Sequence, residues 1–358
     1  METTRKINAP QFFLALFVAQ ATAALAFNAQ YAGGPLFLDN LLSCLLALGM
    51  GLLLALPSWG LLRRWGEGVL PLQGRDWAEK AAAALWLLYF VWENGASLTL
   101  FQIFLLDTVD PEFSAGLVTA VLLGTGLYGA LRGIEAVARC AFCVFFVFLL
   151  GCGGVFAVAA LRFSPQNLSP LFYNGPSQAL EGAALLLSRS TSLAALPLLL
   201  PFVTGKKGRG FALQSLGCAL FFGAALTLLA GCLGPYAASQ NFPLFTLASL
   251  TQIHSLQRLD TVFIGVWIAG LVIRAALELY ACRVCARALL GPRWHKKGAA
   301  LAAALSWGVA LLGVWSAGFR QAVLSTRPLL YATLGAGCLA PGLLWAWQAH
   351  RQRKGARS

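Results

Sequence analysis

Long apolar runs joined by short polar connections dominate this chain and restrict it to a membrane. Of its 358 residues, 59% are hydrophobic and 11% are charged, whereas soluble domains carry about 25% charged residues. A helix that crosses a bilayer needs about 20 mostly apolar residues. Ten segments meet that description, at roughly 10–30, 36–57, 77–106, 115–131, 135–161, 180–204, 209–234, 260–288, 299–318 and 328–348.

These segments predict one transmembrane domain that covers residues 1–358, because no connection between them is long enough for a soluble domain. Backbone groups in lipid must be hydrogen-bonded within the protein, so apolar runs of this length form helices. We therefore expect an all-α integral membrane protein with about ten transmembrane helices, and the lipid bilayer as its surroundings.

The basic residues predict the orientation of the chain. Most of its 26 lysines and arginines fall on one side when the segments alternate, and that side is cytoplasmic by the positive-inside rule. The opposite side holds Arg162, Arg258, Arg320 and Arg327. Both termini are then expected in the cytoplasm. The basic residues behind the net charge of +13 are explained by the orientation of the chain in the membrane, so we expect no nucleic-acid partner.

An alternative interpretation of the N-terminus is a signal peptide. Arg5 and Lys6 precede an apolar run that contains Ala-x-Ala at residues 21–23 and 24–26. Cleavage there would leave nine spans and would spoil the charge pattern, so the ten-span interpretation is favoured.

Two of the ten segments carry polar residues at mid-span. The first reads FVAQATAALAFNAQYAGGP, in which Gln20, Thr22 and Asn28 interrupt the apolar run. The sixth reads ALLLSRSTSLAALPLLLPF and holds the run from Ser188 to Ser192, with Pro197 close behind. Broken helices in lipid line a cavity or pack against protein, and transporters use such breaks to bind substrates. The alternative is that the hydroxyl groups bond back to carbonyls or join helices.

The two interrupted segments are five spans apart, as expected of a five-plus-five inverted repeat in which helices 1 and 6 are broken. No repeat is visible between the two halves at the level of single residues. The prediction of this symmetry therefore rests on the order of the spans and not on sequence similarity between the two halves.

Four ionisable residues lie at mid-span: Glu93, Arg189, Arg274 and Glu278. Charges at this depth usually face the interior of the helix bundle and mark ligand, ion or proton sites. Arg274 and Glu278 are four residues apart on one helix, so they lie on one face and can pair. We expect them to face the interior beside a ligand cavity, with Glu278 neutralising Arg274. The alternative is a purely structural pair.

Metal, cofactor and enzyme signatures are weak or absent from the sequence. Two C-x-x-C pairs, Cys140/Cys143 and Cys282/Cys285, have a spacing that zinc sites use, but cysteine is also a common small apolar residue. We expect no metal and no cofactor. The chain has no G-x-S-x-G, Walker A or H-E-x-x-H motif, and we expect no enzymatic activity.

Two stretches resemble the spore germination permeases, the B subunits of nutrient germinant receptors in endospore-forming bacteria. They are YGALRGIEAVAR (128–139) and NFPLFTLASLTQIHSLQRLDTVFIGVWIAGLVIRAALELYA (241–281). The resemblance extends to the chain length, the ten spans and the short tails. It implies the amino acid–polyamine–organocation superfamily and its five-plus-five fold.

The resemblance also implies a function. Such a subunit sits in the inner spore membrane, binds a small germinant that is typically an amino acid, and acts with an A and a C subunit. Its pocket lies among helices 1, 3, 6 and 8. In this sequence those positions are Gln20, Thr22, Glu93, Ser97, Ser190, Thr191, Ser192, Ala276 and Tyr280.

The chain departs from the family pattern at two places. The centre of the sixth helix is Ser-Arg-Ser-Thr-Ser where glycine is usual, and the Arg274–Glu278 pair adds charge to the eighth. An arginine near the pocket suits a carboxylate ligand, because charge-assisted hydrogen bonds are strong. Two other functions stay open: an amino acid transporter coupled to protons or sodium through Glu93, and a scaffold subunit that binds no ligand.

Overall fold

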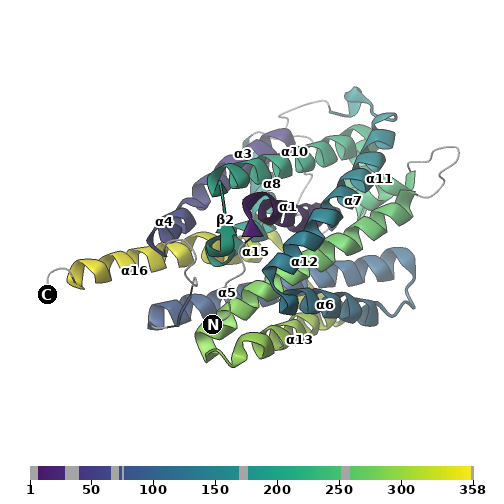
Figure 1. Cartoon of the computed structure of the whole chain (residues 1–358). Coiled ribbons are helices and arrows are strands. Elements are labelled where there is room, and N and C mark those ends of the chain that lie inside the picture. The colour runs from purple at the N-terminus through teal and green to yellow at the C-terminus, as the bar shows by residue number, and fades with distance from the viewer. Residues whose placement is uncertain are drawn as a thin grey trace.

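The computed structural model describes residues 7–28, 40–65, 72–74, 76–168, 176–250 and 259–355. Almost all of them are helical (Figure 1). The α-helices are α1 (Ala9–Leu25), α3 (Asn40–Leu54), α4 (Leu56–Trp65), α5 (Trp77–Phe104), α6 (Ala115–Arg132), α7 (Ile134–Ala160), α8 (Pro176–Ser188), α9 (Thr191–Leu199), α10 (Lys207–Leu233), α11 (Pro243–Leu250), α12 (Leu259–Leu290), α13 (Trp294–Trp315), α14 (Ala317–Leu324), α15 (Thr326–Leu334) and α16 (Ala340–Gly355).

Shorter elements connect these helices. Two π-helical turns, η1 (Leu105–Val109) and η5 (Gly335–Leu339), extend α5 and join α15 to α16. Three 3₁₀ turns are η2 (Pro165–Leu168), η3 (Leu200–Phe202) and η4 (Gly234–Ser239). Two short strands, β1 (Ile7–Asn8) and β2 (Val203–Thr204), complete the described elements.

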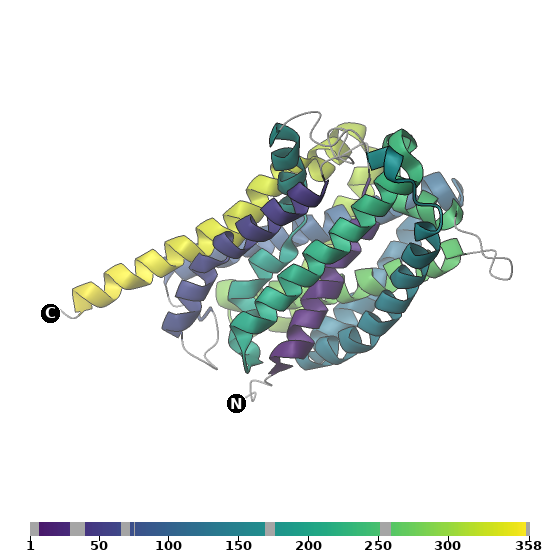
Figure 2. The same cartoon turned by 90° about the horizontal axis from the view of Figure 1, so that it is seen from above.

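The helices have the length and composition of membrane spans. Within the described residues, seven are long and apolar enough to cross a bilayer, and the bent pair α8–α9 makes eight. The other two predicted spans correspond to α1, which has 17 residues, and to α5, which has 28. The chain is an integral membrane protein. The start of α1 and the end of α16 lie toward the same end of the bundle (Figures 1 and 2).

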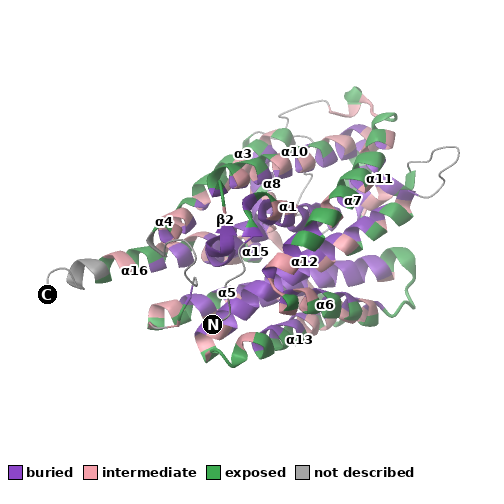
Figure 3. Ribbon diagram, viewed as in Figure 1, coloured by how far each residue is buried: buried purple, intermediate pink, exposed green. Residues whose placement is uncertain are grey.

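Helix α12 forms the centre of the bundle. It packs against α1, α5, α6, α7 and α13. In its most apolar stretch 67% of the residues are buried, against 22% for α7. Figure 3 shows the same contrast, with buried residues along α12 and α5 and exposed residues on outer helices such as α3 and α7. The large apolar side chains on the outer helices have the composition of a lipid-facing surface.

The predicted break in the sixth span is present. Helix α8 ends at Ser188, α9 begins at Thr191, and the two are bent by 42°. Helix α1 ends at Leu25, and the backbone amide of Phe27 bonds to the carbonyl of Ala24 at 3.0 Å. The remainder of the break predicted in the first span, at 29–39, lies outside the described residues.

The first and sixth spans are also joined at their other ends. Strand β1 precedes α1 and pairs in parallel with β2, which follows α9, in the register Ile7↔Val203 and Asn8↔Thr204. The Thr204 hydroxyl donates to the carbonyl of Ile7 at 3.1 Å. This short sheet holds the beginning of one interrupted span against the end of the other.

Candidate functional site

A buried ionic cluster lies between α1, α5 and α12, where the eighth predicted span crosses the first and third. Arg274 on α12 is 2% exposed, and its Nε donates to Glu278 Oε1 at 3.0 Å. Its Nη2 forms an ion pair with Glu93 Oε1 on α5. Its Nη1 donates to the carbonyl of Ala19 on α1 at 3.4 Å. The predicted pairing of Arg274 with Glu278 in the bundle interior is therefore observed, and Glu93 joins it.

Charge in this cluster is unbalanced. One guanidinium carries a single positive charge and faces two carboxylates. Each carboxylate uses one oxygen, and among the described residues neither Glu93 Oε2 nor Glu278 Oε2 has a hydrogen-bond partner. A buried charge without full compensation costs several kcal/mol or more in a low-dielectric interior. The two spare oxygens are thus positions where a further positive charge would be stabilising.

Small residues allow the helices of the cluster to approach closely. A Cβ atom at Gly270 of α12 would overlap the side chain of Thr22 on α1, and one at Gly95 of α5 would overlap Val309 of α13. Thr22 itself donates to the carbonyl of Val18 at 2.7 Å. Its hydroxyl therefore bonds within α1.

A second polar group, the Gln20 cluster, consists of Gln20, Ser190, Ser192 and Gln214. Ser192 Oγ donates to Gln20 Oε1 at 2.7 Å, and Gln20 Nε2 donates to Ser190 Oγ at 3.2 Å. Gln214 Nε2 on α10 donates to Gln20 Oε1 at 3.2 Å. These bonds join α1 to the first turn of α9. Gln20, Ser190 and Ser192 line a pocket of ≈ 480 Å³ between α3 and α10.

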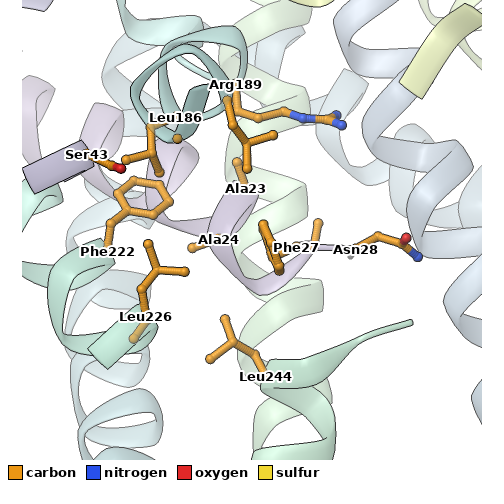
Figure 4. A pocket seen from close by; sticks show the side chains of 14 residues that line it. Ala23, Ala24, Phe27, Asn28, Ser43, Leu186, Arg189, Phe222, Leu226 and Leu244 are labelled. Atoms are coloured by element: carbon orange, nitrogen blue, oxygen red, sulfur yellow. The ribbon is translucent and has the colours of Figure 1, made fainter. Parts of the chain in front are cut away.

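A second pocket, which we call the Arg189 pocket, has an empty volume of ≈ 690 Å³ and is lined by residues of α3, α8, α10 and α11 and by the end of α1. Among its described lining residues, Arg189 is the charged one. Figure 4 shows its side chain along the edge opposite Leu244, with Phe222 and Leu226 forming an apolar wall. Arg189 Nη2 donates to the carbonyl of Leu324 at 2.9 Å. No ion pair joins Arg189 to a carboxylate among the residues the structure describes.

The other predicted site residues lie apart from both pockets. Ser97 donates to the backbone carbonyl of Glu93 at 3.0 Å. Ala276 lies against Gly129 of α6. The ring of Tyr280 lies 6.0 Å from that of Phe202. Thr191 is buried and begins α9. The structure therefore places some of the predicted residues at the break and others around Arg274, while Ala276 lies against α6 and Tyr280 beside Phe202.

The serine run at the break divides between the two predicted roles. Ser188 donates back to the carbonyl of Leu185 at 2.7 Å, as the structural interpretation expects. Ser190 and Ser192 instead bond to Gln20 across the interface. Sequence reasoning missed Gln214, although an amide inside the apolar seventh segment is a detectable signal.

The cysteine pairs lie in different surroundings. Cys140 and Cys143 are exposed on α7, whereas Cys282 and Cys285 are buried in α12. In the described part of the chain, no group of three or more histidine, cysteine or acidic side chains is arranged to hold a metal ion.

Comparison with known proteins identifies the fold. A solved structure of a mutant manganese transporter from Eremococcus coleocola superposes with a TM-score of 0.56, covering 92% of this chain and 74% of that one. The two sequences are 13% identical, so the likeness shows the fold alone. It is the predicted transporter fold with a broken sixth helix.

Sequence comparison identifies the family. No curated protein sequence matches the chain. The model of a family described as spore germination protein matches residues 7–309, which is most of the chain and includes α1, both parts of the sixth span and the ionic cluster. This chain therefore belongs to the spore germination protein family.

Proposed function

We propose that the chain is the membrane-embedded B subunit of a nutrient germinant receptor, and that it binds a small germinant with a carboxylate, such as an amino acid. In this proposal it acts with an A and a C subunit in the inner membrane of the spore. Membership of the family and the transporter fold support the receptor role. The observation that supports a carboxylate ligand is the position of Arg189 at the break between α8 and α9.

Arg189 has the features of an anion-binding group. Its backbone lies between the last residue of α8 and the start of α9, and the residue lines an otherwise mostly apolar pocket. Figure 4 shows its guanidinium extending along the edge of that pocket, away from Phe222 and Leu226. Its guanidinium donates one hydrogen bond, to the Leu324 carbonyl, among the described residues, which leaves several of its five N–H donors for a ligand. Arginine and a carboxylate form paired, charge-assisted bonds.

The remainder of the Arg189 pocket suits the apolar part of a small ligand. Ala23, Ala24 and Phe27 come from the end of α1, and Phe222 and Leu226 come from α10. Pockets of this kind bind through apolar walls and a few polar groups that fix orientation. A hydrophobic amino acid combines these two chemistries.

Thermal stability of the detergent-purified full chain tests this proposal. Each of the twenty amino acids is added, together with the amine that corresponds to each hit but lacks its carboxylate. A ligand at 100 times its Kd stabilises the folded state by about 2.7 kcal/mol. We expect stabilisation by one or a few amino acids and none by the amines.

Two arginine variants make the test specific. Arg189→Gln should strongly reduce the stabilisation, whereas Arg139→Gln should retain it, because Arg139 lies on the exposed side of α7 and pairs with Glu135. A shift of the same size in Arg189→Gln as in wild type would contradict the assigned site. No shift with any amino acid would contradict the ligand class and would favour the scaffold role.

Transport is a second candidate function. The buried carboxylates Glu93 and Glu278 share one guanidinium, which is the kind of site where a proton or sodium ion can be coupled to a substrate. Uptake of a labelled amino acid into proteoliposomes that contain this chain alone would favour transport. Binding without uptake would favour the receptor.

A further inference from the structure

The four ionisable residues at mid-span form two opposite pairs of charges. We propose that they act as one electroneutral set, in which an anion on Arg189 causes the Glu93–Arg274–Glu278 cluster to take up one proton. This inference rests on the proposed carboxylate site at Arg189. It adds a proton-binding site at the cluster and a thermodynamic linkage between that site and the carboxylate site at Arg189.

The geometry of the cluster provides a place for the proton. Arg274 already donates to Glu93, to Glu278 and to the Ala19 carbonyl. The oxygens Glu93 Oε2 and Glu278 Oε2 are buried, and neither has a hydrogen-bond partner among the described residues. A proton on either oxygen removes one negative charge without breaking a contact to Arg274.

Arg189 acts on the cluster through space. Electrostatic interactions connect Arg189 with Glu93 and with Arg274, although no ion pair joins Arg189 to either carboxylate in the described residues. Two unit charges in a protein interior interact by about 4 kcal/mol at 4 Å and an effective dielectric constant of about 20. The interaction decreases only slowly with distance where water is absent, so Arg189 offsets part of the excess negative charge.

Hydrogen bonds also join the break to α5, one helical turn from the cluster. Thr333 on α15 donates to the carbonyl of Ser188, the residue before Arg189, at 3.1 Å. The hydroxyls of Thr333 and Tyr89 lie 3.2 Å apart. Tyr89 lies on α5, four residues before Glu93, so it is one helical turn away. The backbone at the break is thus tied through Thr333 to the helix that carries Glu93.

Few other titratable groups act on the cluster. Tyr89 on α5 interacts electrostatically with all three of its members, and Cys282 on α12 interacts with Glu278. Helices α1 and α9, which pack against α12, contain no charged residue. The charge balance therefore depends on Arg189, Arg274, Glu93 and Glu278. With a carboxylate on Arg189 the set would carry one uncompensated negative charge, and one proton restores neutrality.

A proton fits the cluster better than a metal ion does. Sodium and other hard cations need several oxygen ligands. Here two carboxylate oxygens are available, and no third acidic, cysteine or histidine side chain of the described residues joins them in a metal-binding arrangement.

The first experiment needs no ligand, because Arg189→Gln removes the same charge that a bound anion would neutralise. Thermal stability of the full chain is measured across a pH series for wild type, Arg189→Gln, Arg189→Lys and Arg139→Gln. In Arg189→Gln the folded cluster holds a proton that the unfolded glutamates lose. Stability should therefore fall as pH rises, with the folding equilibrium changing by about tenfold per pH unit for one proton.

The controls separate the cluster from the rest of the protein. Wild type, Arg189→Lys and Arg139→Gln should show a weaker pH dependence, because each keeps the charge at position 189 that offsets part of the excess negative charge. Adding Glu93→Gln to Arg189→Gln should remove the pH dependence of stability, since glutamine has the shape and charge of the protonated acid. If Arg189→Gln has the same pH profile as wild type, the proposal is overturned. If its stability depends on sodium at fixed pH, the bound cation is not a proton.

The second experiment uses the amino acid found by the stability screen. Calorimetry in two buffers of different ionisation enthalpy counts the protons taken up on binding. We expect wild type to take up one proton and Glu93→Gln to take up none. Binding without proton uptake would overturn this inference and leave the proposed function intact. If no amino acid binds but Arg189→Gln acquires its pH dependence, the proton site stands and the proposed ligand is wrong.

Discussion

Arg274 illustrates how one residue can fix three helices in a membrane. Its guanidinium contacts α1, α5 and its own helix α12 at once, in an interior that excludes water. An arginine at this depth is costly unless it is paired. The spacing of Arg274 and Glu278 in the sequence predicted that they pair. The sequence did not predict that Glu93 on α5 is the second partner of Arg274.

The first prediction concerns the loss of this arginine. Arg274→Gln should destabilise the folded chain by about 3–5 kcal/mol, because it leaves Glu93 and Glu278 buried without a counter-charge. Chemical denaturation of the purified chain measures this. Arg139→Gln, which removes an exposed ion pair, should cost about 1 kcal/mol or less. Equal effects of the two substitutions would contradict the role of the buried cluster.

The second prediction concerns a close contact beside the cluster. Gly270→Ala places a methyl group against Thr22, which donates within α1 and is fixed there. Overpacking of this kind typically costs about 1–3 kcal/mol. Gly265→Ala on the same helix is the matched control, since a Cβ there meets nothing within 4 Å. Gly270→Ala should lower the unfolding temperature and Gly265→Ala should leave it unchanged or raise it.

At the scale of elements, the break between α8 and α9 is the feature that distinguishes this bundle from a set of continuous spans. Its sequence signal was clear, because five polar residues in a row cannot all face lipid. The 42° bend and the separation of the two helices agree with that signal. What the sequence did not determine is which serines would bond within the helix and which would bond to α1, since that depends on how α1 packs.

The third prediction tests the tie between α1 and α9. A double-mutant cycle with Gln20→Leu and Ser192→Ala isolates their 2.7 Å hydrogen bond. Contacting residues in one network show coupling energies of about 0.5–3 kcal/mol. We expect a value in this range from denaturation of the four proteins. Effects that add without coupling would show that the contact contributes nothing to stability.

At the scale of the whole molecule, sequence predicted the class, the family and most of the architecture. Long apolar runs identify membrane helices because lipid leaves the backbone no other solution. The predicted ends of the spans differ from the observed helix ends where a short helix follows a span, as α14 follows α13. The single pocket among helices 1, 3, 6 and 8 remains a prediction. Positions such as Ala276 were assigned by helix number, yet the rotation of α12 directs that residue toward α6.

The fourth prediction concerns orientation. The start of α1 and the end of α16 lie toward the same end of the bundle, and the basic residues predict that this end is cytoplasmic. A C-terminal fusion to green fluorescent protein should therefore fluoresce, and one to periplasm-dependent alkaline phosphatase should be inactive. The reverse pair of results would contradict the predicted topology.

The central claim is that Arg189 binds the carboxylate of a small germinant, and an affinity measurement tests it most directly. Isothermal titration calorimetry compares wild type, Arg139→Gln and Arg189→Gln with the most stabilising amino acid. Hydrogen bonds to a charged group contribute about 1.5–3 kcal/mol, so Arg189→Gln should weaken binding by about tenfold to a hundredfold. Arg139→Gln should bind as wild type does. Equal affinity in wild type and Arg189→Gln would contradict the claim.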